Sequence, residues 1–484
     1  MIPELRKLSI GILVLFGALF VSTTIIQIFQ ADSLRVDARN VRTLYESYST
    51  ERGSIVVGST VIAESIPSDD IYKYQRVYHG GGLYAPVTGY YSVNQGTSGL
   101  EYAMNDQLSG SSNSQFLDQV LALVSGRDPK GASVKLTLNA SVQQAARDAF
   151  GSLEGAAVAF EPSTGRVLAL VSTPSYDPND LATHEASSAA GAFEQLTTSK
   201  EQPLSNRAIA GTLYHPGSVF KLVVAAAALD SGEYNEESTF DNPVTLALPQ
   251  SNSTVSNSNG QTCGYGASVT IATALRLSCN IPFAELGSEL GQDLIRSYAE
   301  AFGFGATVEI PMASTPSVYP TDMDEAQVML SSFGQFDVQV SPLQMAMVAS
   351  AIANDGVLMS PTVVESVLAP DLSPVTSFTP VQYSTPITPG TANLLTQMMV
   401  DDVANGVASN AAIPGVEVAG KTGTAENGKK QPYTLWFVGF APADNPKVAV
   451  AVVVENGGGF GQSGSGNSIA APIARAIMKA VLAQ

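Results

Sequence analysis

The segment HPGSVFK, residues 215 to 221, places a hydroxyl and an amine three positions apart, directly after a Pro-Gly break. The apolar run that follows predicts a buried helix, with Ser218 at its N-terminus and Lys221 over the same face. A serine hydroxyl is a weak nucleophile unless a base takes its proton, and a lysine can be that base if burial lowers its pKa. A helix cap followed by a surface lysine is the alternative, but a charge in so apolar a helix is costly unless it is used.

A second polar stretch is LRLSCNIPFAELG, residues 275 to 287. Ser278 and Asn280 alternate around Cys279, so both side chains can point the same way from an irregular turn between two predicted helices. Taken alone, this stretch also fits an ordinary Ser and Asn turn.

The third stretch, GVEVAGKTGTAENG, carries Lys-Thr-Gly-Thr at 421 to 424 on a predicted strand. Gly423 would let a substrate backbone approach closely. Lys421 supplies positive charge, and the hydroxyls of Thr422 and Thr424 can bind a carboxylate. A strand edge with a lysine is the alternative, and the glycine pattern of a P-loop is missing.

In this order, S-x-x-K, S-x-N and K-T-G resemble the motif set of penicillin-recognising serine enzymes. Four further segments resemble the transpeptidase domain of class B penicillin-binding proteins: AAVAFEPSTGRVLALVSTPSYDPN, NRAIAGTLYHPGSVFK, SSFGQFDVQVSPLQMAMVASAIANDG and WFVGFAP. DARNVRTLYESYSTERGSI and GLEYAMNDQLSG resemble the N-terminal pedestal of that class. The resemblance therefore covers nearly the whole chain.

The resemblance implies a role for each motif residue. Ser218 would be the acylated nucleophile and Lys221 its general base. Ser278 and Asn280 would relay protons and hold the substrate peptide, and Lys421 would tune the charge of the site.

The same resemblance implies how the substrate is bound. Thr422 and Thr424, with Gly423 between them, would bind the terminal carboxylate of the peptide. The backbone N–H groups of Ser218 and Thr424 would form an oxyanion hole.

The function implied is D,D-transpeptidation, in which peptidoglycan stem peptides are cross-linked through a Ser218 acyl-enzyme that β-lactams inhibit. A D,D-carboxypeptidase, a β-lactamase or β-lactam sensor, and a non-catalytic membrane-anchored scaffold are the alternatives. The long pedestal and Cys279 in the middle motif, where class A β-lactamases carry Asp, argue against the β-lactamase. Only about 120 residues separate the apolar N-terminal segment from the transpeptidase region, which excludes a glycosyltransferase domain between them. Class B relatives then imply a polytopic membrane glycosyltransferase as partner.

The N-terminal segment LSIGILVLFGALFVSTTIIQIF, residues 8 to 29, contains no charge and is long enough to cross a bilayer. Arg6 and Lys7 precede it, which places residues 1–7 in the cytoplasm and the catalytic part outside. A cleaved signal peptide is the alternative, but the run ends without a good cleavage site. We expect a single-pass protein of the cell membrane.

Composition excludes other classes. The formal net charge is −19 and there is no basic run, which argues against nucleic acid. The three histidines are scattered and the two cysteines too sparse for a metal cluster, so we expect no metal and no cofactor. Export favours a disulfide between Cys263 and Cys279, with two buried thiols as the alternative.

Periodicity predicts an α+β fold. Strand pairs near residues 155–172 and 433–456 flank predicted helices over 218–232, 269–290 and 341–354, so the two terminal hairpins should share one sheet. The resemblance implies the fold of a penicillin-binding transpeptidase, or serine β-lactamase-like, domain with a small, mostly-β pedestal and one transmembrane helix. The expected divisions are a tail at 1–7, an anchor at 8–29, a pedestal at 30–150 and a transpeptidase domain at 151–484.

Overall fold

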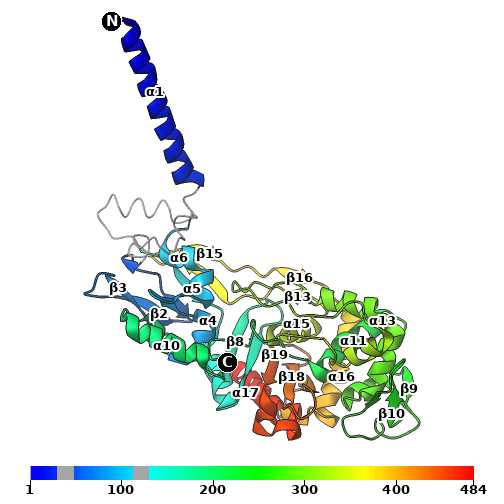
Figure 1. Ribbon diagram of the computed structural model, residues 1–484. Helices are drawn as coiled ribbons and strands as arrows, with labels where there is room; N and C mark the ends of the chain where they lie inside the picture. Colours follow the sequence, from blue (N-terminus) through cyan, green and yellow to red (C-terminus); the bar gives the residue numbers. More distant parts are fainter. Residues whose placement is uncertain (1, 30–47, 113–129) are drawn as a thin grey trace.

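A five-stranded antiparallel sheet unites the two hairpins predicted near either end of the catalytic region (Figure 1). The computed structural model describes residues 2–29, 48–112 and 130–484. The strand order is β17-β18-β19-β7-β8, with β7 at Gly155–Phe160, β8 at Val167–Thr173, β17 at Ala419–Ala425, β18 at Thr434–Ala441 and β19 at Val448–Val454. The prediction that the hairpins share a sheet is confirmed.

Helices cover both faces of this sheet, which explains why strands β7, β18 and β19 are buried at every position. Successive strand residues point to opposite faces: Ala157 and Ala159 of β7 pack in one apolar cluster, and Ala156 and Val158 in another. The helices against the first face are α8 at Ala140–Phe150 and α17 at Ala471–Leu482, and the helix against the second is α15 at Pro342–Ala353.

The first two polar motifs lie among helices that pack on the second side of the sheet, and the third lies on edge strand β17. A 3-10 turn at Gly217–Phe220 leads into α11, which is buried over almost its whole length, as a helix that is apolar all round must be. Helix α11 packs against α13 and α16, and α16 packs along β17. The bounds are α11 Lys221–Asp230, α12 Ile271–Arg276, α13 Ile281–Ala301, α14 Glu325–Ser331 and α16 Pro389–Asn405.

Two short strand pairs form a small lobe beside these helices: β9 Thr239–Asp241 with β12 Ser268–Thr270, and β10 Thr245–Ala247 with β11 Thr254–Ser256. A disulfide joins Cys263 of this lobe to Cys279, which lies between α12 and α13. The lobe is therefore tied covalently to the turn that carries Ser278 and Asn280.

The pedestal contains a six-stranded sheet in the order β15-β14-β6-β1-β2-β3. Four strands come from the N-terminal region: β1 Ile55–Val57, β2 Thr60–Pro67, β3 Tyr74–Tyr78 and β6 Ser133–Leu136. The other two, β14 Val364–Leu368 and β15 Pro374–Ser377, come from far downstream, where the sequence predicted only transpeptidase domain. Conversely, helix α8 packs against α17 and β8 rather than against the pedestal sheet.

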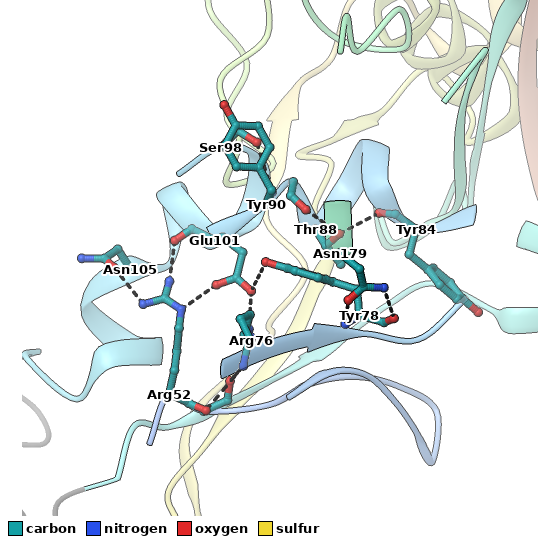
Figure 2. Close-up of polar contacts among 12 residues, drawn as sticks. Arg52, Arg76, Tyr78, Tyr84, Thr88, Tyr90, Ser98, Glu101, Asn105 and Asn179 are labelled. Carbon is teal, nitrogen blue, oxygen red and sulfur yellow. Dashed lines mark hydrogen bonds and ion pairs between the residues drawn. The ribbon is translucent and has the colours of Figure 1, made fainter. Parts of the chain in front are cut away.

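A buried network of charges holds the pedestal together (Figure 2). Glu101 of helix α5 (Gly99–Ala103) accepts hydrogen bonds of 2.6 Å from the Nε atoms of Arg52 and Arg76, and one of 3.2 Å from the Tyr78 hydroxyl. Burial raises the pKa of this carboxyl, but the two guanidinium groups outweigh burial and the pKa lies below its ordinary value. The side chain of Asn179 pairs with both the N–H and the C=O of Tyr78, each at 2.9 Å, and so docks the catalytic domain on strand β3.

At the N-terminus, helix α1 (Ile2–Thr24) runs into a π-helical turn at Ile25–Phe29. Figure 1 shows α1 standing away from the folded body, and none of its apolar stretch Arg6–Gln27 is buried. The helix is long and apolar enough to cross a membrane.

At the C-terminal end, the Ser465 hydroxyl caps the helical turns that lead into α17 and accepts the backbone N–H of Ser468. Part of the predicted pedestal, at 30–47 and 113–129, lies outside the described residues, together with most of the motif that begins at Asp37.

Candidate active site

Ser218 and Lys221 lie side by side where the 3-10 turn becomes helix α11. The Lys221 side chain is completely buried. Its Nζ is 3.0 Å from Ser218 Oγ, 2.8 Å from the Ser278 carbonyl oxygen and 2.8 Å from Asn280 Oδ1. The orientation of Asn280 is fixed because its Nδ2 donates to the Ser256 carbonyl at 3.0 Å.

These three contacts suit a neutral amine. A carbonyl oxygen and an amide oxygen can only accept, so they take the two N–H groups of a neutral Lys221, from Ser278 and Asn280. The remaining neighbour, the Ser218 hydroxyl, can donate as well as accept, so the lone pair of a neutral amine would face it. This is the arrangement that general-base activation of Ser218 requires.

Electrostatics favour the same protonation state. The pKa of Lys221 is lowered well below its ordinary value, first by burial and second by the positive charge of Lys421, with Asp402 opposing both. Burial disfavours a charged amine because the interior solvates it poorly. Lys221 therefore has the environment of a base rather than of a structural cation.

The turn between α12 and α13 presents Ser278 and Asn280 to this amine. Ser278 adopts a left-handed backbone conformation with φ 58°, uncommon for a residue with a side chain. The turn is held by the disulfide at Cys279 and by Asn257, whose Oδ1 accepts hydrogen bonds from the backbone N–H groups of Asn280 (2.8 Å) and Ile281 (3.2 Å).

Lys421 approaches from strand β17 and is also completely buried. Its Nζ is 2.8 Å from Ser278 Oγ, 3.2 Å from the Thr422 carbonyl oxygen and 3.3 Å from Asp402 Oδ2. Burial lowers the pKa of Lys421, and Asp402 opposes that effect. The two lysines are thus linked through Ser278.

The sequence prediction missed Asp402 and Asn257. Asp402 is a completely buried carboxylate in helix α16, and burial raises its pKa to about 6 although the charge of Lys421 lowers it. The one available signal was an acidic pair, Asp401 and Asp402, about twenty residues before Lys421, in a segment for which no helix was predicted, and acidic residues usually face solvent.

A cleft of about 860 Å³ opens in front of these groups. Six predicted site residues are among those that line it: Ser218, Ser278, Asn280, Thr422, Gly423 and Thr424. The two lysines lie behind its wall, within contact distance of the lining residues. The structure therefore brings all eight predicted site residues to one place, from three elements far apart in sequence.

Gly423 serves packing as well as any substrate contact. A Cβ at this position would lie 2.9 Å from the Pro216 carbonyl oxygen and 3.1 Å from Trp436 Cβ, so only glycine lets β17 lie against the Pro216-Gly217 turn. This close approach brings Thr424 next to the turn that carries Ser218. Thr422 Oγ1 lies 3.4 Å from the Val407 carbonyl oxygen.

Comparisons with known proteins agree with this geometry. Residues 155–479 match the family described as penicillin binding protein transpeptidase domain, and residues 52–134 match the penicillin binding protein A dimerisation domain. The match to the A type agrees with the sequence-based interpretation, in which the chain resembles penicillin-binding protein A of actinobacteria.

Two curated relatives match along their full lengths. The Peptidoglycan D,D-transpeptidase PbpA of Mycolicibacterium smegmatis is 43% identical, over 99% of each chain. The protein of the same name from Mycobacterium tuberculosis is 41% identical, again over 99% of each.

Solved structures match in three dimensions as well. Penicillin-binding protein A from M. tuberculosis, as a ceftriaxone acyl-enzyme complex, has a TM-score of 0.87 at 40% identity, covering 90% of this chain and 100% of that chain. The D,D-transpeptidase domain of a peptidoglycan glycosyltransferase from Eggerthella lenta has a TM-score of 0.78 at 35% identity, covering 90% and 99%. The fold, the cleft and these matches together show that the chain belongs to the penicillin-binding protein transpeptidase family.

Proposed function

We propose that this chain is a serine D,D-transpeptidase that cross-links peptidoglycan stem peptides through an acyl-enzyme on Ser218 and is inhibited by β-lactams. The observation that carries the proposal is the environment of Lys221. Its amine lies 3.0 Å from the Ser218 hydroxyl, and its two other neighbours are oxygens that only accept. The names of the full-length relatives support the same reaction.

In the first half-reaction, Ser218 Oγ attacks the carbonyl carbon between the two terminal D-alanines, and its proton passes to Lys221 Nζ. The carbonyl oxygen becomes an oxyanion, for which we propose the backbone N–H groups of Ser218 and Thr424 as donors, each worth about 3 kcal/mol in comparable sites. The C–N bond then breaks, and the proton held by Lys221 Nζ passes through the Ser278 hydroxyl to the leaving D-alanine amine, so that Lys221 is neutral again. The product is an ester on Ser218.

In the second half-reaction, an amine from another stem peptide attacks this ester. It gives up a proton through Lys221, a new amide bond forms, and Ser218 Oγ regains its proton as it leaves. Thr422 and Thr424 are the proposed contacts of the terminal carboxylate in the first half, and Asn280 the proposed contact of the peptide.

The test is acylation of the detergent-solubilised full-length protein by a penicillin, with the adduct mapped by mass spectrometry. We expect one adduct, on Ser218, that is absent from Ser218→Ala and retained in Ser297→Ala, which replaces an exposed serine of α13. An adduct on another serine would refute the assignment. With a peptide substrate, product formed by water alone, with no response to an added amine acceptor, would show a D,D-carboxypeptidase.

The proposed location is the cell membrane, with a single span and the catalytic domain outside the cytoplasm. Support comes from the apolar stretch Arg6–Gln27, 22 residues with mean hydropathy 2.3, and from the positive charges of Arg6 and Lys7 at its N-terminal end. N-terminal sequencing of protein extracted from membranes should give the intact N-terminus. A sequence that begins after Gln30 would show that the segment is cleaved.

The proposed partner is a polytopic membrane glycosyltransferase, which would polymerise the strands that this chain cross-links. Support comes from the relationship to class B enzymes and from the membrane-adjacent pedestal. Site-specific crosslinking from pedestal residues in intact membranes tests it, and the absence of any crosslink to a polytopic glycosyltransferase would argue against it.

The proposed domain division is a pedestal over 30–150 and a transpeptidase domain over 151–484, except that one helix of the first range packs with the transpeptidase domain and two strands of the second range belong to the pedestal sheet. Helix α8 packs with the transpeptidase domain, and strands β14 and β15 complete the pedestal sheet. Limited proteolysis should therefore give no stable fragment that ends near residue 150.

A further inference from the structure

The two oxygens of the Asp402 side chain have different partners. Its Oδ1 accepts the backbone N–H of Val407 at 2.8 Å. Its Oδ2 has no hydrogen-bond donor in suitable geometry among the described residues, and it lies 3.3 Å from Lys421 Nζ. A completely buried carboxylate oxygen in this situation needs a cation beside it, because an uncompensated buried charge is strongly destabilising.

The Lys421 ammonium also has several partners. A lysine ammonium has three N–H donors, and its Nζ has three oxygen neighbours: Ser278 Oγ, the Thr422 carbonyl and Asp402 Oδ2. The contacts with Ser278 and Thr422 are hydrogen bonds, and the contact with Asp402 is an ion pair, so the ammonium is held with one N–H directed at the Ser278 hydroxyl. Without Asp402, this buried cation would lose the negative charge that lies 3.3 Å from it.

Asp402 does not contact the reacting groups directly. Ser278, Thr422 and Val407 are among the residues that line the cleft, whereas Asp402 lies behind them in α16. Its charged neighbours are Lys421 and, farther away, Lys221. The other charges at this part of α16 are Asp401 and Arg276, which pair with each other at 3.2 Å with both side chains partly exposed.

We propose that Asp402 is a positioning residue of the transpeptidase site, which anchors the Lys421 ammonium from behind and thereby directs it at Ser278. This inference rests on the proposed function and adds a member to its machinery. In this proposal Asp402 holds and charges Lys421, and Lys421 in turn binds Ser278 and lowers the pKa of Lys221.

The charge relationships give the proposal a direction that can be measured. Asp402 raises the pKa of Lys421, and the positive charge of Lys421 lowers the pKa of Lys221 more than the charge of Asp402 raises it. Neutralising Asp402 has two opposite effects on Lys221: the direct loss of its negative charge lowers the pKa of Lys221, whereas the lower pKa of Lys421 lets that lysine lose its charge. We expect the second effect to be the larger where Lys421 becomes neutral, because Lys421 has more influence on Lys221 than Asp402 has, and acylation then requires a higher pH.

The test uses Asp402→Asn, with Asp401→Asn as the matched control that makes the same change one residue away. The acylation rate by a fluorescent penicillin is measured from pH 5 to pH 10. We expect Asp402→Asn to acylate at least about tenfold more slowly at pH 7 and its rising limb to lie at higher pH, while Asp401→Asn follows the wild type. An unchanged profile, or a limb moved to lower pH, would overturn the proposal.

The same substitution made in the Lys421→Ala variant distinguishes a role of Asp402 through Lys421 from a general structural role. Coupling between residues in contact shows as non-additivity in a double-mutant cycle. Asp402→Asn should therefore add little to the loss already caused by Lys421→Ala. If it reduces the rate by the same factor in both backgrounds, Asp402 acts elsewhere and the proposal fails.

An independent readout does not need catalysis. In NMR spectra of protein with 13C-labelled lysine, the Lys421 signal can be assigned by its loss in Lys421→Ala. This signal should titrate at lower pH in Asp402→Asn than in the wild type, and its titration should be unchanged in Asp401→Asn. An unaltered titration in Asp402→Asn would overturn the proposal whether or not the protein is acylated. Failure of the wild type to be acylated at all would instead count against the proposed function, so the two failures are distinguishable.

Discussion

Burying a lysine side chain in a protein is costly, and two buried lysines lie behind the wall of this cleft. Lys221 and Lys421 are both completely buried, and both have pKa values below the ordinary one. Their surroundings differ in one respect: a carboxylate lies beside Lys421, whereas only oxygens that accept and one hydroxyl surround Lys221. The same side chain thus has the setting of a fixed cation in one place and of a base in the other.

Replacing Lys221 by arginine should reduce acylation of Ser218 by a factor of about 10² to 10⁴, the usual contribution of a general base. A guanidinium does not deprotonate in proteins and has no acceptor. In the wild type the rate should rise with pH as the Lys221 amine becomes neutral, and because its pKa is lowered, this rise should come well below the ordinary lysine range.

The measurement is the pH profile of the acylation rate for the wild type and Lys221→Arg, with Lys200→Arg, an exposed lysine, as control. Near wild-type acylation in Lys221→Arg would mean that the proton leaves Ser218 by another route, for which Ser278 is the next candidate.

Among single residues, the sequence predicted those that belong to short motifs, in which the reacting side chains are a few positions apart. Ser218 and Lys221 are one helical turn apart, and Lys421 begins a short motif, so both could be found without a structure. Asp402 and Asn257 could not, because their partners lie in other elements and nothing near them in the sequence marks them as buried.

Among the elements, the turn between α12 and α13 depends on a covalent link. The disulfide between Cys263 and Cys279 closes a sequence separation of 16 residues and holds the two motif residues that flank Cys279. The disulfide was predicted because the domain is expected outside the cytoplasm, where disulfides form. The spacing of the two cysteines alone does not distinguish a disulfide from two buried thiols.

Removing this bridge should cost about 3 kcal/mol of stability by loop-closure arguments, and acylation should slow because the turn is less firmly held. The measurement compares the thermal unfolding and acylation of the wild type with those of the double variant Cys263→Ser and Cys279→Ser. Adding a reductant should move the wild type towards the double variant and leave the double variant unchanged. Equal stability of the oxidised wild type and the double variant would contradict the prediction.

Helices and strands with a regular apolar pattern were predicted well, including α11, α15 and the two hairpins of the central sheet. Strands β14 and β15 were not assigned to the pedestal. Their alternation is compatible with any sheet edge, and pairing with β6 depends on a partner some 230 residues away, which no local pattern reveals.

For the molecule as a whole, the contact between pedestal and catalytic domain depends on a rigid pedestal. Glu101 holds Arg52 and Arg76, and the neighbouring strand residue Tyr78 receives Asn179 of the catalytic domain. A buried carboxylate shared by two guanidinium groups therefore supports the surface on which the catalytic domain is docked.

Glu101→Gln should destabilise the pedestal by about 3–5 kcal/mol, because it leaves two buried cations without their counter-charge. Glu51→Gln is the matched control: Glu51 pairs with Lys130 at a partly exposed site, where an ion pair is worth about 0–1 kcal/mol. Chemical unfolding of the full chain measures both. Equal effects of the two substitutions would show that the buried network carries no special share of the stability.

The position of β14 also sets an order of events during biosynthesis. Strand β6 ends at Leu136 and is an edge strand until Val364–Leu368 arrives to pair with it. At the usual synthesis rate of about 5–20 residues per second, about 230 residues of chain take roughly 10–50 s to appear. Throughout that interval the emerging pedestal presents an unpaired row of backbone groups, the kind of edge that invites wrong partners. The nascent chain therefore has to be shielded on the way out, and the domain that is made first is among the last to be completed.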